Sequence, residues 1–314
     1  MIQSEKKFSV SDLEAKARAI IGLIPSLRTK PVRMSRLKGG LTNRNYRLDC
    51  EGEQFVLRVM GDNSRLLGIN RRTEHACLKA AHTLGVGAEV IAFFPRKGAL
   101  VTRFVTGRVL GPKEVQKPTI LRRVVASLRQ YHDHSKGAGN FCAFQTIRRY
   151  FALSCKRKVA FPKNIDHALR ILSRIEEERG APDRICHCHN DLLSSNLVDD
   201  GRKVWILDWE YGGAGDLFFD LGNLAANNLF DEEQESRLLK FYFGQARPLD
   251  HRRLRLMRLA SDMREAMWGF LQTRISKLDF DYENYARSHF ERFLKSAECD
   301  FSFRRDEFHE SPNS

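Results

Sequence analysis

Three polar residues between positions 191 and 208 have the types and spacing that a phosphoryl transfer requires. Asp191 and Asn196 are separated by the loop-like stretch 192–195, and a short apolar run of strand type, 204–207, ends at Asp208. Phosphoryl transfer depends on positioning and charge neutralisation, and Mg²⁺ prefers carboxylate and amide oxygens. We therefore expect Asn196 and Asp208 to bind Mg²⁺ next to a nucleotide, while Asp191 orients a hydroxyl and accepts its proton.

The same stretch resembles a known family. The pattern His189-x-Asp191-x4-Asn196, with Asp208 following in Ile-Leu-Asp-Trp-Glu, is similar to the catalytic motif of the choline kinase and aminoglycoside phosphotransferase superfamily. The resemblance extends from about Val32 to Phe293. It implies an α+β, protein-kinase-like bilobal fold, with a small β-sheet N-lobe, a larger and mostly helical C-lobe, and the use of ATP with Mg²⁺.

We predict three parts of the chain: an N-terminal nucleotide-binding lobe at 1–103, a C-terminal catalytic and acceptor-binding lobe at 104–303, and a flexible tail at 304–314. Alternating apolar residues predict five strands before residue 106, and a helix at 64–84 among them. Apolar residues at three- and four-residue spacing predict helices afterwards. These are 119–132, 144–158, 164–178, 217–229, 231–243, 250–276 and 281–296.

The predicted nucleotide site lies mostly in the N-terminal lobe. Glu74 shares a helix face with apolar residues, so it needs a buried partner, and Arg58 on the preceding strand is the candidate. A Gly-Gly turn can let backbone amides approach phosphates, although such a turn is often only a hairpin. The resemblance implies nucleotide contacts there and at a hinge over 102–105. The resulting set is Gly40, Leu41, Thr42, Asn43, Arg58, Glu74, Thr102 and Phe104.

An acceptor site is predicted from rings and a carboxylate. Trp268 could offer a ring face to a quaternary ammonium, and Glu210 and Tyr211 could add a charge and a second ring. Trp268 could equally be an anchor in the core of a long helix. The family often has a second Trp three residues later, where this chain has Leu271, so the aromatic cage for choline would be incomplete.

The run Cys186-His187-Cys188-His189 suggests a zinc site, since Cys and His are the usual ligands. We reject it, because strand alternation sends the two Cys to one side and the two His to the other. No second Cys/His pair has finger-like spacing. His189 is expected to hold the loop rather than react, and the resemblance gives Asp220 the role of bracing the catalytic loop.

The composition of the chain bears on its partners, its disulfides and its location. The formal net charge of +14 favours anionic partners, but the basic residues are scattered, so a nucleic-acid partner is not expected. Seven cysteines at irregular spacing do not indicate a disulfide framework. We see no signal peptide and no apolar run long enough to span a membrane, and therefore expect a cytoplasmic protein of undetermined oligomeric state.

The expectation from sequence is an ATP:alcohol phosphotransferase that phosphorylates the hydroxyl of a small cationic amino alcohol, with choline as first choice. Ethanolamine, thiamine, an aminoglycoside or a sugar are alternative acceptors. A nucleotide-binding pseudokinase with a regulatory role is an alternative of another class, although Asp191, Asn196 and Asp208 are all present. A protein that binds RNA or a phospholipid surface is a third possibility, and it rests only on the net charge.

Overall fold

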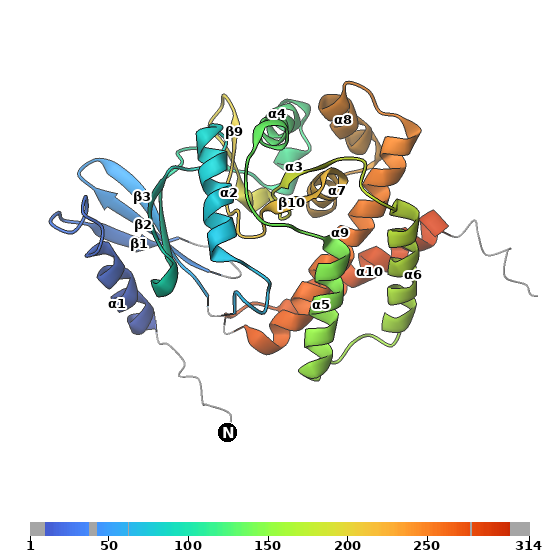
Figure 1. Ribbon diagram of the computed structural model, residues 1–314, viewed down its shortest axis with the longest axis horizontal. Helices are drawn as coiled ribbons and strands as arrows, with labels where there is room; N and C mark the ends of the chain where they lie inside the picture. Colours follow the sequence, from blue (N-terminus) through green and yellow to red (C-terminus); the bar gives the residue numbers. More distant parts are fainter. Residues whose placement is uncertain (1–9, 38–42, 62, 277, 302–314) are drawn as a thin grey trace, which may run out of the picture.

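The computed structural model describes residues 10–37, 43–61, 63–276 and 278–301. Its first part is an antiparallel sheet of five strands in the order β1-β2-β3-β5-β4. The strands are β1 (Arg33–Arg36), β2 (Arg44–Cys50), β3 (Glu53–Val59), β4 (Val90–Phe94) and β5 (Ala99–Arg103), with the short 3₁₀ helix η1 (Pro95–Lys97) between the last two. Figure 1 shows the sheet at one end of the molecule, with the helical part at the other.

Two helices cover opposite faces of this sheet. Helix α1 (Val10–Ile21) shares an apolar core with Leu57 and Val101, which face each other in the sheet. Leu100, the residue before Val101, belongs to the core on the side of α2 (Arg71–Thr83). Arg58 is paired in register with Leu100 and therefore also faces α2. Strand alternation thus places the buried Arg58 on the face of the sheet that α2 covers.

Helix α2 is shorter than the sequence predicted. The expected helix at 64–84 begins only at Arg71, because Asn70 caps it: the Asn70 side chain accepts hydrogen bonds from the backbone N–H groups of Arg72 and Thr73. Gly68 before the cap has a left-handed φ of 75°, which ends any earlier helical turn. The predicted buried face is confirmed, with Glu74, Cys77, Leu78 and Ala81 buried.

The second part of the chain is mostly helical, as predicted (Figure 1). Its helices are α3 (Pro112–Val115), α4 (Pro118–His134), α5 (Ala143–Lys156), α6 (Ile165–Arg179), α7 (Leu217–Asn227), α8 (Glu232–Phe243), α9 (Pro248–Ile275) and α10 (Tyr282–Phe301). Short strands form two small sheets: β7 (Ile185–Cys188) with β10 (Gly213–Asp216), and β6 (Arg108–Val109) with β8 (Leu197–Asp199) and β9 (Val204–Ile206). The division at residues 103 and 104 stays a prediction.

Helix α9 is the centre of this part. It has 28 residues, and its segment from Leu259 to Gln272 is buried on every side. It crosses α7 closely at Gly222, where a Cβ atom would lie 2.6 Å from the backbone nitrogen of Arg258. A helix buried all round must pair each of its charged side chains inside the protein. Within the described residues, every helix is too short or too polar to span a bilayer.

One such pairing fixes α10 against α9. The Asp262 carboxylate is 1% exposed and accepts from His289 Nδ1 at 3.1 Å and from Arg292 Nε at 2.9 Å. Burial alone would raise the pKa of Asp262, but the hydrogen bonds and charges of His289 and Arg292 outweigh it and hold the pKa below its usual value. The ion pair therefore stabilises the fold at pH values above the unfolded-state pKa of about 3.9.

We predict that Asp262→Asn lowers the free energy of unfolding by about 3 kcal/mol at pH 7, because Arg292 and His289 lose their buried counter-charge. The wild-type advantage should be lost as the pH falls through the lowered pKa of Asp262, so the two proteins should converge at pH values below that pKa. Urea unfolding at several pH values measures this. Asp281→Asn is the control, since either side chain can cap α10 through the Asn284 N–H. A pH-independent difference would contradict the prediction.

Candidate active site

The loop after β7 carries the predicted catalytic residues, and a single buried carboxylate holds it. Asp220 of α7 accepts hydrogen bonds from the backbone N–H groups of His189, at 2.7 Å, and Asn190, at 2.6 Å. It also contacts His132 Nε2 of α4 at 3.0 Å. The predicted bracing role of Asp220 is confirmed by these contacts.

His189 is structural, as predicted. It is fully buried, its Nε2 donates to the backbone oxygen of Leu207 at 2.8 Å, and its Nδ1 accepts from the Asp191 N–H at 3.2 Å. This pattern requires the neutral imidazole, and burial lowers the pKa of His189 accordingly. His189 thus connects the loop to the residue just before Asp208.

Asp191, Asn196 and Asp208 are brought together. Asn196 lies in the 3₁₀ turn η2 (Ser194–Asn196), and its Nδ2 donates to the backbone oxygen of Asp191 at 2.9 Å. The Leu207 N–H donates to the Asn196 backbone oxygen at 2.8 Å, which places Asp208 beside them. Because Nδ2 of Asn196 is used, the amide oxygen is the atom that this residue can offer to a cation.

Arginines and carboxylates join the sheet to this loop. Arg58 forms an ion pair with Glu74, as predicted, and a second one with Asp208. Arg71 contacts Glu74 Oε2 at 2.7 Å and Glu210 Oε2 at 3.2 Å. These groups form a charged ladder from β3 and α2 across to the segment 208–210.

Two residues predicted to bind the acceptor have other partners. Glu210 is 5% exposed and accepts from Asn43 Nδ2 at 2.9 Å as well as from Arg71, so it belongs to the charged ladder. The guanidinium of Arg264 lies 4.9 Å from the centre of the Tyr211 ring, where the sequence had placed the acceptor's cation.

The other predicted nucleotide residues are only partly described. Gly40, Leu41 and Thr42 lie outside the described residues, while Asn43 is buried and also accepts from the Gly61 N–H. Thr102 pairs with Val56 in the sheet, and the Phe104 N–H donates to the Gln54 backbone oxygen. Their contact with a nucleotide stays a prediction.

Arg264 of α9 is a site residue that sequence reasoning missed. Its Nη2 donates to Asp191 Oδ1 and to the Asn190 backbone oxygen, both at 2.9 Å, and the side chain is 1% exposed. Burial raises the pKa of Asp191 well above its usual value, and the charge of Arg264 opposes this. The signal in the sequence was an adjacent Arg-Glu pair directly before the apolar run 266–271, where charges need partners.

Trp268 lies on the same side of α9, next to two tyrosines. Its ring centre is 5.7 Å from those of Tyr282 and Tyr285, in edge-on geometry. The Tyr285 hydroxyl donates to Glu265 Oε2 at 2.7 Å, and Glu265 neighbours Arg264. Trp268 is thus linked to Asp191 through Tyr285, Glu265 and Arg264, whereas Leu271 is fully buried in the core.

Two buried polar atoms of the Arg264–Glu265 pair have no hydrogen-bond partner among the described residues. They are Nε of Arg264 and Oε1 of Glu265. Oε1 of Glu265 lies 3.0 Å from Nη1 of Arg264, but without hydrogen-bond geometry. Buried polar groups are normally satisfied, so these two atoms are available to a polar ligand or to water.

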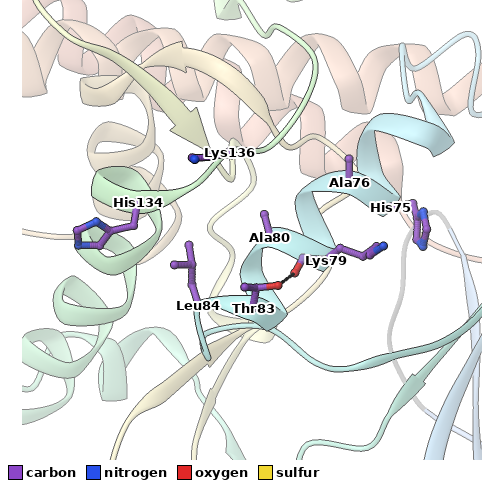
Figure 2. A pocket seen from close by; sticks show the side chains of 8 residues that line it. All are labelled: His75, Ala76, Lys79, Ala80, Thr83, Leu84, His134 and Lys136. Carbon is purple, nitrogen blue, oxygen red and sulfur yellow. Dashed lines mark hydrogen bonds between the residues drawn. The ribbon is translucent and has the colours of Figure 1, made fainter.

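A hollow of about 500 Å³ lies elsewhere, on α2. Figure 2 shows it between α2, from His75 to Leu84, and the segment with His134 and Lys136. Its lining residues on α2 are on the face opposite Glu74. It is therefore separate from the candidate active site.

Comparisons with known proteins agree with this geometry. The family model for choline/ethanolamine kinase matches residues 34–238. The chain is 27% identical to ethanolamine kinase 2 of Mus musculus, over 88% of this chain and 80% of that protein. It is 28% identical to protein LicA of Haemophilus influenzae, over 76% and 72%.

Among solved structures, a choline/ethanolamine kinase family protein from Mesorhizobium loti superposes with a TM-score of 0.79. The match has 28% sequence identity and covers 92% of this chain and 97% of that one. The predicted α+β fold with a protein-kinase-like architecture is confirmed.

The bracing of the loop leads to a prediction. Asp220→Ala removes the acceptor of two loop N–H groups, which then have no protein partner. We expect hydrogen exchange at the His189 and Asn190 amides to accelerate at least about 100-fold, equivalent to about 3 kcal/mol of lost protection. Exchange measured by mass spectrometry or NMR on the folded variant provides the test.

The matched control is Asp231→Asn. Asp231 caps α8 by accepting from the Gln234 N–H, and Asn can cap equally well. This variant should keep the exchange protection of the loop. Equal exchange in Asp220→Ala and wild type would show that Asp220 does not hold the loop.

Proposed function

Since the chain belongs to the choline/ethanolamine kinase family, we propose that it transfers the γ-phosphoryl group of ATP to the hydroxyl of a small amino alcohol. The family places it among the ATP-dependent phosphotransferases. The observation that carries the proposal is the convergence of Asp191, Asn196 and Asp208 on one braced loop. A pseudokinase is disfavoured, since Asp191, Asn196 and Asp208 are all present. The ion pairs that Asp191 and Asp208 form, with Arg264 and Arg58, lie within the proposed site.

We propose that Asp191 orients the acceptor hydroxyl and accepts its proton. Arg264 donates to Oδ1 of Asp191, so Oδ2 can accept the hydrogen bond of the acceptor hydroxyl. The raised pKa of Asp191 makes it a stronger proton acceptor than an exposed carboxylate, while Arg264 favours the ionised form that the reaction needs. Arg264 is thus a positioning residue: it acts through Asp191.

Asn196 and Asp208 are the proposed Mg²⁺ ligands. Both offer oxygen atoms, as this hard cation requires, and Asp208 is 30% exposed in its side chain, so it is open to the nucleotide side. When bound, Mg²⁺ would neutralise charge on the phosphates. On the same side we propose that Arg58, held by Glu74, faces the phosphates, and that the segments 40–43 and 102–104 contact the nucleotide.

For the acceptor we propose a primary ammonium, as in ethanolamine, in preference to the quaternary ammonium of choline. Oε1 of Glu265 is ion-paired with Arg264 but has no hydrogen-bond partner, and of the two ammonium types only the one with N–H groups can donate to it. A quaternary ammonium needs ring faces, but Arg264 already lies over Tyr211, and Trp268 meets its neighbouring tyrosines edge-on. Trp268 would then form an apolar wall beside the acceptor's carbon atoms.

The test is Mg²⁺-dependent ADP release with ethanolamine, choline, thiamine, an aminoglycoside and a sugar. We expect kcat/KM for ethanolamine to exceed that for choline at least about 10-fold, and Glu265→Gln to lower the ethanolamine value about 10- to 100-fold. Asp191→Asn should lower kcat by about a factor of 1,000 and keep nucleotide affinity. ATP binding without ADP release in the presence of any of these acceptors would refute the proposed reaction.

The same panel separates the acceptors from each other. A preference for choline that survives Glu265→Gln would exclude the ammonium site on Glu265 and restore the aromatic site around Trp268. Strong turnover of a neutral sugar would exclude the amino-alcohol class. In both cases Asp191→Asn remains the control for the phosphotransferase chemistry itself.

The role of Arg264 gives a separate prediction. Arg264→Met should lower kcat about 10- to 100-fold and leave KM for ATP unchanged, because it loosens Asp191 and Asn190 without touching the nucleotide side. Arg264→Lys should restore part of the rate, since it keeps the charge but loses the forked geometry.

Steady-state kinetics of both variants provide the measurement, with Arg274→Met as the control. Arg274 lies on the same helix but bonds only at the surface, to the Lys158 backbone oxygen. A purely structural role for Arg264 would predict equal losses in Arg264→Met and Arg264→Lys that follow the loss of thermal stability, and this outcome would overturn the assignment.

A further inference from the structure

A cluster of nucleophilic side chains lies behind the catalytic loop and takes no part in the proposed reaction. It consists of His132 on α4 and Cys186 and Cys188 on β7, and all three are buried. Their candidate ligand atoms lie within 4.8 Å of one another, and the two sulfur atoms are 3.6 Å apart. Both thiols are free.

The sequence argument against a metal site was incomplete at this point. Strand alternation does place Cys186 and Cys188 on one side of β7, as predicted, while the imidazole of His187 bonds to the Ser135 backbone oxygen. The third ligand comes from α4, however, which packs on β7. No spacing rule could find it, because the helix and the strand meet only in the folded chain.

From these positions we infer that His132, Cys186 and Cys188 form a binding site for a borderline-soft divalent cation such as Zn²⁺. Two thiolates and an imidazole are three of the four ligands of common tetrahedral zinc sites. A tetrahedral zinc with bonds of about 2.3 Å to sulfur requires a sulfur-to-sulfur distance of about 3.8 Å. The thiols already lie within a few tenths of an ångström of that spacing. Hard cations such as Mg²⁺ do not select such ligands.

Both ring nitrogens of His132 have a hydrogen-bond partner. Nδ1 lies 2.8 Å from the Tyr242 hydroxyl, and Nε2 lies 3.0 Å from Asp220 Oδ2. A histidine ligand keeps one ring nitrogen for a hydrogen-bond partner that fixes its orientation, and here each nitrogen has one. Cation binding would displace one of these two partners and keep the other. Cys186, with 8% of its surface exposed, is the most accessible of the three ligands.

Occupation of this site would reach the catalytic loop through Asp220. The Asp220 carboxylate that bonds His132 also accepts from the N–H groups of His189 and Asn190, immediately before Asp191. A cation at His132 changes the charge and the hydrogen bonding of this shared group. We therefore expect Zn²⁺ at this site to alter turnover without contact with either substrate.

Co²⁺ is the probe for binding, because cobalt thiolates absorb in the near ultraviolet and tetrahedral Co²⁺ absorbs strongly in the visible. Reduced full-length protein, stripped with a chelator, is titrated under argon. We expect one equivalent of Co²⁺ to give both absorptions and one equivalent of Zn²⁺ to abolish them. Cys186→Ser should weaken Co²⁺ binding at least 10-fold, and Cys188→Ala, checked for folding by circular dichroism, should do the same.

Cys155→Ser is the matched control, because Cys155 is an exposed free thiol on α5 and should leave the absorption unchanged. Absence of the absorptions in wild-type protein, or their persistence in Cys186→Ser, would overturn the site. This readout does not depend on catalysis, so its failure leaves the proposed function untouched.

The coupling to turnover has its own test. ADP release is measured with excess Mg²⁺, with and without one equivalent of Zn²⁺, in wild type and in Cys186→Ser. We expect Zn²⁺ to lower kcat at least 3-fold in wild type and to have no effect in Cys186→Ser. Equal inhibition of both proteins would place the zinc effect at the Mg²⁺ ligands instead and overturn the coupling.

Discussion

The active-site loop depends on one fully buried carboxylate. Asp220 accepts hydrogen bonds from the backbone N–H groups of His189 and Asn190, and it also contacts the imidazole of His132. The loop at 189–193 belongs to neither a strand nor a helix, and Asn190 adopts a left-handed φ of 64°. Backbone groups buried in such a conformation must find partners elsewhere. Without Asp220 they would have none in the protein, and the position of Asp191 would no longer be defined.

A second constraint is that charged groups connect the sheet to the loop. Arg58 and Arg71 reach from β3 and α2 to Asp208 and Glu210, with Glu74 between them. Two cations and three carboxylates leave a local charge of −1 before any substrate binds. Each of these groups is held by others of the set, so one substitution would leave a charge unpaired. The relative position of the two parts is thus tied to the residues that we propose for phosphate and metal.

Local patterns in the sequence predicted part of this arrangement. The loop residues Asp191 and Asn196 and the strand end at Asp208 lie within one short stretch, so their proximity follows from chain geometry. Glu74 was predicted to be buried because a helical period placed it among apolar residues, and Arg58 was its nearest candidate partner. The start of α2 was placed seven residues too early, because the side chain of Asn70 was not recognised as a cap.

The residues that sequence reasoning missed are those whose partners lie far away in the chain. Arg264 reaches Asp191, and His132 reaches Cys186 and Cys188, only after helices have packed on the loop. Glu210 was assigned to the acceptor because it follows Asp208, but its carboxylate is taken by Asn43 and Arg71. These contacts also join segments that lie far apart in the sequence, and the role of Glu210 at the acceptor stays a prediction.

The burial of α9 supports the proposal that the acceptor is a cation with N–H groups. Arg264 and Glu265 are adjacent on a helix segment without access to water, and together with Asp191 they carry a net charge of −1. A neutral acceptor would leave this charge uncompensated in a buried site, which is unfavourable. A quaternary ammonium would compensate the charge but leave Oε1 of Glu265 without a hydrogen bond. A primary ammonium would do both, and this supports the proposed preference for an acceptor with N–H groups.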